Sequence, residues 1–410
     1  MPEESIALFT LSNGLRVVFK PVHSGVAHCG LMVHSGSRDE LIQEHGLAHF
    51  IEHNLFKGTR SRKSFHILSR IDSVGGELNA YTAKEEMCMY SSFQKQYLER
   101  ATELLADVFQ NSTFPDNELQ KEKDVIIDEI SSYKDTPSEQ IFDDFEGLLF
   151  RGHPLGRSIL GSEETVKGFT RQDILNYTAR FYLPENMVFS CVGPYKASDV
   201  FAMVDHYFNG IKSVRHLPSR KPPGTYKPFH KEISRNGHQV HSIIGNRCLD
   251  IHSSKRMAMI LLNNMLGGPS MNSRLNLNIR ERYGFTYYLE SGYSAFTDTG
   301  IFTVYLGTDK KHFERTTDLI KKEFGKLRDN KIGTRQLSLA KKQLVGNIAM
   351  SQESNNGVMT ALAKSLLLFG HIEPLADIYK KVERITADQL LELANRFFDE
   401  QKLSQLTYTC

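Results

Sequence analysis

Three segments in the first half of this chain recur in its second half, in the same order and at nearly constant offsets. Residues 50–59 (FIEHNLFKGT) match 261–270 (LLNNMLGGPS), residues 118–130 match 336–348, and residues 170–182 match 386–398. The offsets are 211, 218 and 216 residues. Each match is weak alone, but their common order and spacing indicates an internal duplication. The sequence therefore predicts two homologous domains.

The length of the chain and a proline-rich segment support this division. At 410 residues the chain is longer than a single small core usually serves. Residues 214–230 contain four prolines with basic residues between them, which is typical of a linker. We predict a first domain at 1–213, a linker at 214–229 and a second domain at 230–410.

Local patterns in both halves predict an α+β fold, in which each domain is a mainly antiparallel sheet packed with helices. In the first half they predict a hairpin over 5–19 with its turn at Asn13-Gly14, strands over 27–34, 77–82, 87–93 and 187–192, and helices over 65–74, 96–110, 116–133 and 169–182. In the second half, a helix that ends at Gly267-Gly268 precedes strands over 284–293 and 300–306.

Composition excludes several classes of partner. The formal net charge is +2 and the basic residues are scattered, so no nucleic acid is expected as a partner. No apolar run is long enough to span a membrane, and the first residues lack the pattern of a signal peptide. The five cysteines lie far apart without a C-x-x-C, which predicts free thiols and a cytoplasmic location.

The segment 44–59 carries the strongest chemical signal, because it contains His49, Glu52 and His53 as H-x-x-E-H. On a helix, His53 would lie about 40° from His49, and Glu52 about 60° away on the other side. Two imidazoles at this spacing suit one tetrahedral Zn²⁺, and the carboxylate can take a proton from water that the metal activates. This is the zinc motif H-E-x-x-H inverted. Gly58 is expected to end the helix. The alternative is an amphipathic helix with two half-exposed histidines.

A third ligand is expected on the helix predicted over 116–133. Glu122 and Glu129 are seven residues apart, so both carboxylates face the same side of that helix. We predict Glu129 as the third metal ligand and Glu122 as an acid that orients the ligands. Most acids on helices are solvated, and Asp124 and Asp128 lie nearby, so spacing alone leaves the choice open.

The second half of the repeat lacks the predicted site residues, which bears on whether they serve chemistry or stability. At the positions of His49, Glu52, His53 and Glu129 the second half has Ile260, Asn263, Asn264 and Asn347. A stability role common to both halves would be expected to leave similar residues in both. The asymmetry therefore favours chemistry in the first half.

Several separated motifs together resemble the pitrilysin/insulinase family of zinc peptidases, which includes insulin-degrading enzyme and mitochondrial processing peptidase. They are GLAHFIEHNLFKGT at 46–59, Glu129 about seventy-five residues after His53, and IRERYGFTYY at 279–288. SVGGELNAYT at 73–82 and HPLGRSILG at 153–161 also match, so the resemblance covers nearly the whole chain. It points to a two-domain member of the family.

The resemblance implies a zinc metalloendopeptidase with one Zn²⁺ per chain. His49, His53 and Glu129 resemble the three zinc ligands of the family. Glu52 resembles its general base, and Glu122 resembles its second acid. A His₂Glu set suits zinc, although Mn²⁺ or Co²⁺ could also occupy it.

The resemblance also implies residues that hold the substrate. Asn79, Ala80 and Tyr81 match an edge strand on which an extended peptide pairs. Arg280 and Tyr287 resemble a pair that the second half brings to the substrate and the tetrahedral intermediate. Without the resemblance they would be a surface arginine and a half-buried tyrosine.

Family members enclose their substrate in a closable chamber of four such domains, and this chain supplies two. A dimer is therefore implied, and because the metal set and the Arg–Tyr pair stand in one chain, a homodimer is favoured over a heterodimer with a related chain. The implied activity is hydrolysis of unfolded peptides. Two alternatives stay open: a processing peptidase for one class of precursor, and an inactive scaffold subunit, a class that usually loses its ligands. His45 departs from the pattern and is expected to serve the start of the helix.

Overall fold

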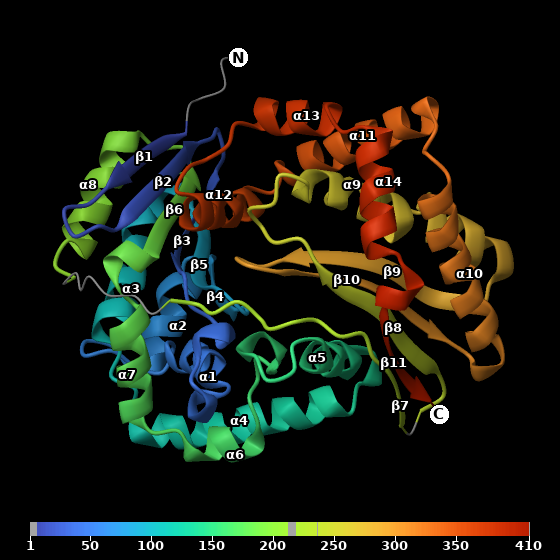
Figure 1. Ribbon diagram of the computed structural model, residues 1–410. Helices are drawn as coiled ribbons and strands as arrows, with labels where there is room; N and C mark the ends of the chain where they lie inside the picture. Colours follow the sequence, from blue (N-terminus) through green and yellow to red (C-terminus); the bar gives the residue numbers. More distant parts are fainter. Residues whose placement is uncertain (1–5, 212–218, 236, 410) are drawn as a thin grey trace. The chain divides into compact units, whose positions relative to one another are not determined.

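The computed structural model describes residues 6–211, 219–235 and 237–409, which form two compact units (Figure 1). Ser5 of the predicted hairpin, residues 214–218 of the predicted linker and Cys410 lie outside the described residues. Unit 1 comprises Met1–Ile130, Arg157–Arg220 and Met350–Ile372. Unit 2 comprises Ser131–Gly156, Lys221–Ala349 and Glu373–Cys410.

Unit 1 is built on a six-stranded sheet with the order β1-β2-β6-β3-β5-β4. The strands are β1 (Ala7–Thr10), β2 (Arg16–Pro21), β3 (Val26–Val33), β4 (Glu77–Thr82), β5 (Met87–Gln94) and β6 (Met187–Gly193). Strands β2 and β6 are parallel, whereas the other neighbours are antiparallel. Its helices include α1 (Leu47–Asn54), α2 (Ser64–Asp72), α3 (Leu98–Asn111), α4 (Asp116–Lys134), α6 (Glu163–Gly168), α7 (Arg171–Phe181), α8 (Ala197–Phe208) and α12 (Asn355–Phe369).

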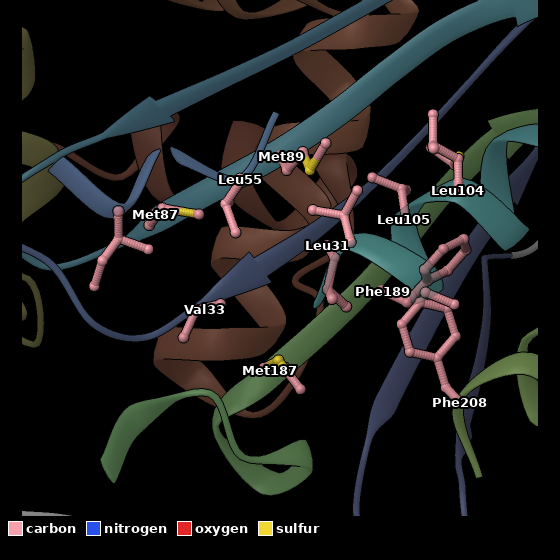
Figure 2. Close-up of a cluster of buried hydrophobic side chains, with 14 of the residues drawn as sticks. Leu31, Val33, Leu55, Met87, Met89, Leu104, Leu105, Met187, Phe189 and Phe208 are labelled. Atoms are coloured by element: carbon pink, nitrogen blue, oxygen red, sulfur yellow. The ribbon is translucent and has the colours of Figure 1, made fainter. Parts of the chain in front are cut away.

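Alternate residues of the central strands pack the two faces of this sheet. Leu31 and Val33 of β3, Met87 and Met89 of β5, and Met187 and Phe189 of β6 point into one core, beside Leu104 and Leu105 of α3 (Figure 2). The residues between them, Met32, Cys88 and Val188, belong to a second apolar cluster. This period of two is the reason that the strands were readable from sequence. The four described cysteines are free, and Cys29, Cys88 and Cys191 are buried.

The second face of the sheet is covered by α12, which comes from the second half of the chain. Helix α12 packs across β6, β3 and β2. It buries Val358, Met359 and Leu362 in the cluster that contains Met32. Ser190 of β6 donates a 2.8 Å hydrogen bond to the carbonyl oxygen of Met359. A distant segment therefore completes unit 1.

Unit 2 has a five-stranded sheet with the order β7-β11-β8-β10-β9. Its strands are β7 (His230–Ser234), β8 (Val240–Cys248), β9 (Thr286–Ala295), β10 (Gly300–Thr308) and β11 (Ser404–Thr409). Its helices include α5 (Pro137–Leu149), α9 (Arg256–Gly267), α10 (Lys310–Asp329), α11 (Thr334–Ser351), α13 (Leu375–Glu383) and α14 (Ala387–Phe397). Helix α5, from the first half of the chain, packs on β8 and β11 through Ile141, Phe145 and Leu149.

The two units have the same topology. The strand order β2-β6-β3-β5-β4 corresponds to β7-β11-β8-β10-β9, and both orders begin with a parallel pair. Helices α7 and α14 each begin after a threonine, Thr170 or Thr386, in a capping box. The α+β class with two homologous domains is confirmed. The predicted domain boundaries divide the chain between its two repeats. The compact units differ from this division, because α5 of the first half belongs to unit 2 and the equivalent helix α12 of the second half belongs to unit 1.

No helix in the described part of the chain combines the length and the apolar character that crossing a membrane requires.

Shortening Met359 to alanine should loosen unit 1, although this residue belongs to the second half of the chain. Loss of a buried methionine side chain costs about 2–5 kcal/mol. We expect faster amide hydrogen exchange in β3 and β6, measured by mass spectrometry. Met350→Ala is the matched control, because Met350 is exposed. Unchanged protection of β3 and β6 in Met359→Ala would contradict the role of α12.

Candidate metal centre

The three side chains of the H-x-x-E-H motif lie on the short helix α1. The helix begins after Gly46, whose φ of +94° is a left-handed conformation that favours glycine. The imidazoles of His49 and His53 lie edge to face, with ring centroids 4.6 Å apart. His45 precedes the helix, and its Nε2 lies 3.0 Å from the carbonyl oxygen of Ser158. This contact agrees with the role expected for His45 at the start of the helix.

The helix ends earlier than expected, at Asn54, so the prediction that Gly58 ends it is wrong. Gly58 instead forms a bridge with Lys63, and Thr59 forms one with Ser112. The hydroxyl of Thr59 donates to Asp107 of α3. Gly58 and Thr59 therefore pair outside the helix, with residues 63, 107 and 112.

Glu129 of α4 meets the two histidines. Its Oε2 lies 3.8 Å from His49 Nε2 and 3.6 Å from His53 Nε2. Among the described residues, His49, His53 and Glu129 are the one group of three or more potential ligand side chains whose ligand atoms converge, all within 4.8 Å of one another. The three predicted metal residues are thus brought together from two helices.

These side chains fit Zn²⁺. Ligand atoms around a tetrahedral Zn²⁺ lie about 3.4 Å apart, close to the two distances from Glu129. Burial, and then the charge of His53, lower the pKa of His49 to about 3, so that its imidazole stays neutral. A neutral imidazole is the form that binds a metal. Two imidazoles and one carboxylate leave the fourth position of a tetrahedron open.

Glu122 lies on α4, as Glu129 does, and it contacts His53. Its Oε2 lies 3.1 Å from His53 Nδ1, and its Oε1 lies 2.5 Å from Lys57 Nζ. A hydrogen bond from Nδ1 to Glu122 leaves Nε2 of His53 for the metal. Lys57 was missed in the sequence analysis, where its only signal is its place four residues after His53.

Glu52 lies on α1 beside the last residue of strand β4. Burial raises the pKa of its carboxyl, and hydrogen bonding from Thr82 opposes this effect. A carboxylate with a raised pKa is a better proton acceptor near neutral pH. The position and the environment of Glu52 are those of a candidate general base.

Strand β4, which carries Asn79, Ala80 and Tyr81, lies at the edge of its sheet. Within the described part of the chain, β4 pairs with β5 alone, and α1 packs beside it. Asn79 is exposed, whereas Ala80 and Tyr81 are half-buried. The unpaired main chain of such an edge can accept a further strand.

Arg280 and Tyr287 belong to unit 2 and contact each other. Arg280 lies in a π-helical turn over Asn276–Glu281, and Tyr287 is an exposed residue of β9. The guanidinium carbon of Arg280 lies 5.4 Å from the centre of the Tyr287 ring. They form a pair, and their action on a substrate stays a prediction.

Comparison with known proteins establishes the family. Residues 16–163 match Insulinase (Peptidase family M16), and residues 168–344 match the Peptidase M16 inactive domain. An "Uncharacterized zinc protease YmxG" from Bacillus subtilis is 33% identical over 402 residues, which cover 96% of both chains. The chain belongs to peptidase family M16. A further relative, an uncharacterized zinc protease of Mycobacterium leprae, is 33% identical over 96% of this chain and 89% of its own.

Solved structures share the fold of this M16 peptidase. A protease from Helicobacter pylori has a TM-score of 0.94 at 20% identity, over 99% of this chain and 100% of its own. A Pseudomonas fluorescens structure described as a peptidase M16 inactive domain has a TM-score of 0.92 at 20% identity, over 99% and 98%. The resemblance inferred from the motifs is confirmed. The three predicted metal ligands lie in the segment 16–163, and Asn263 and Asn264 lie in the segment matched to the inactive domain.

Replacing Lys57 by methionine should weaken zinc binding by about tenfold, because Glu122 would lose the cation that holds it against His53. Competition with a chromophoric chelator measures this affinity. Lys121→Met is the matched control, because Lys121 pairs with Glu118 on the surface of α4. Equal affinities of the Lys57 and Lys121 variants would show that Lys57 does not support the site.

Proposed function

We propose that this M16 peptidase is a zinc endopeptidase that hydrolyses unfolded peptides. The observation that carries the proposal is the convergence of His49, His53 and Glu129, with Glu52 on the same helix. The unpaired edge of β4 beside α1 adds a place for an extended substrate. The residues proposed as metal ligands, base and substrate strand all belong to unit 1, which supports the proposal.

Each side chain has a distinct task in the proposed reaction. His49, His53 and Glu129 hold the ion, while Glu122 orients His53. A bound Zn²⁺ would supply Lewis-acid chemistry, polarising the scissile carbonyl and acidifying water. Glu52 takes the proton of the attacking water and passes it to the leaving amine.

The edge strand favours unfolded peptides as the substrate class. Asn79, Ala80 and Tyr81 offer main-chain N–H and C=O groups, which pair with any extended peptide. A peptide inside a folded protein already uses these groups in its own structure. Recognition through the main chain therefore tolerates many sequences.

Arg280 and Tyr287 are proposed to donate hydrogen bonds to the oxyanion that forms during hydrolysis. Such donors from the second half act on the substrate when a chamber closes around it. A homodimer would supply the four domains of the chamber. A processing peptidase for one precursor shares this chemistry and would differ in the lining of the chamber.

Replacing Glu52 by glutamine should abolish peptide hydrolysis while zinc stays bound, because the amide keeps the shape of the carboxylate and loses its proton affinity. The assay uses a quenched, unstructured peptide of about twenty residues, with and without a chelator. The wild-type rate should rise with pH as Glu52 loses its proton, with a midpoint above the ordinary carboxyl pKa because burial raises it. No cleavage by zinc-loaded wild type would favour the scaffold alternative.

Replacing Tyr287 by phenylalanine should lower kcat about 10²-fold with a smaller effect on KM, because the hydroxyl acts where negative charge develops. Tyr288→Phe is the matched control, since Tyr288 is the next residue of β9 and is also exposed. Steady-state kinetics on the same quenched peptide measure both variants. Equal kcat values for the two variants would remove Tyr287 from the mechanism.

A further inference from the structure

Glu40 is a buried carboxylate that the proposed reaction does not use. It lies seven residues before the first residue of α1 and is 3% exposed. Its Oε2 accepts a 2.9 Å hydrogen bond from the N–H of Gly46, and its Oε1 accepts one of 2.9 Å from the N–H of Ala48. Ala48 is the residue before His49. The side chain of Glu40 thus binds two N–H groups at the start of α1.

These two bonds replace a cap that the helix cannot supply itself. The first N–H groups of a helix have no partner within it. Gly46 stands at the capping position and has no side chain to accept them. The positive end of the helix dipole also favours a carboxylate there. Glu40 therefore caps α1 from outside the helix.

The segment that carries Glu40 is held by residues 157–165. Arg157 donates from Nη2 to the carbonyl oxygen of Glu40 (2.6 Å) and from Nη1 to that of Leu41 (2.8 Å). Gly46 and Gly161 touch so closely that a Cβ on Gly46 would lie 2.6 Å from the Cα of Gly161. Both glycines have positive φ angles, +94° and +81°. The segment that carries the cap is therefore fixed to residues 157–161 by hydrogen bonds and by close packing.

The charge of Glu40 follows from two opposed effects. Burial, with a smaller effect from the charge of Glu44, raises the pKa of its carboxyl to about 8, even though the N–H groups of Ala48 and Gly46 and the charge of Arg157 act to lower it. A carboxylate offers strong acceptors on both oxygens, whereas one oxygen of a neutral carboxyl carries the proton and accepts more weakly. Each oxygen of Glu40 accepts an N–H, so both hydrogen bonds are strongest when the side chain is ionised, whereas a pKa of about 8 leaves much of it neutral near pH 7.

We propose that Glu40 is a positioning residue of the metal centre, which holds the first turn of α1 so that His49 meets Glu129. The two N–H bonds of Glu40 fix the rotation and the position of the helix beside His49. The consequence for peptide hydrolysis rests on the proposed function, whereas the consequence for metal binding does not. Outer contacts of this kind typically change metal affinity by about 10–100-fold.

The test compares Glu40→Gln, Glu40→Ala and Glu44→Gln in the full chain. Glutamine keeps the size of the side chain and one acceptor, and alanine keeps none. Glu44 is the matched control: it is a buried carboxylate of the same loop, which binds Arg180 and the N–H of Leu41. Zinc affinity is measured by chelator competition, and the visible spectrum of the Co²⁺-loaded protein reports the geometry of the site.

We expect zinc affinity to fall about tenfold in Glu40→Gln, more in Glu40→Ala, and less than threefold in Glu44→Gln. Amide exchange over residues 46–54 should quicken in both Glu40 variants, and their Co²⁺ spectra should change. Wild-type affinity and spectrum in Glu40→Gln, or an equal loss in Glu44→Gln, would overturn the proposal. If Glu40→Ala does not fold, Glu40→Gln still decides. If zinc affinity falls in Glu40→Gln but the zinc-loaded wild type cleaves no peptide, the positioning role of Glu40 stands and only the proposed function is refuted.

Discussion

The six-stranded sheet of unit 1 is apolar on both faces, so each face must be covered by other elements to be removed from water. One face packs against a core to which both α1 and α4 contribute, through residues such as Phe50, Ile51 and Ile126. Because the two helices bury their apolar sides in the same core, their polar residues His49, His53 and Glu129 can meet. The other face needs α12, which arrives from the second half of the chain. The candidate site therefore depends on apolar packing that involves none of its own side chains.

The short helix α1 is oriented by polar contacts around its length. Glu40 binds its start, Thr82 of the edge strand binds Glu52 in its second turn, and Glu122 binds His53 near its end. A helix of eight residues is marginal by itself, so these partners and the core give it one position. The two-helix site thus has the supporting contacts that a metal centre requires.

Much of unit 1 could be predicted from local pattern. Strand β4 was predicted at its observed bounds, 77–82, and α4 was predicted within one residue, because periodicities of 2 and 3.6 are visible in a single segment. The early end of α1 and the role of Glu40 could not be predicted, since both depend on residues distant in sequence. The sequence patterns did not predict helices α5 and α12, and the exchange of these helices between the units has no local signal.

The sequence by itself determined the duplication, the α+β class, the family and the residue types of the candidate site, because repeats, periodicity and motif spacing are properties of the chain order. The tertiary structure alone decided that Glu129 rather than Asp124 or Asp128 meets the two histidines. It also decided that Lys57 binds Glu122, that Glu40 binds the start of α1, and that each sheet takes a helix from the other half. Those outcomes depend on which surfaces are buried together. Burial is a property of the whole fold, and no single segment contains it.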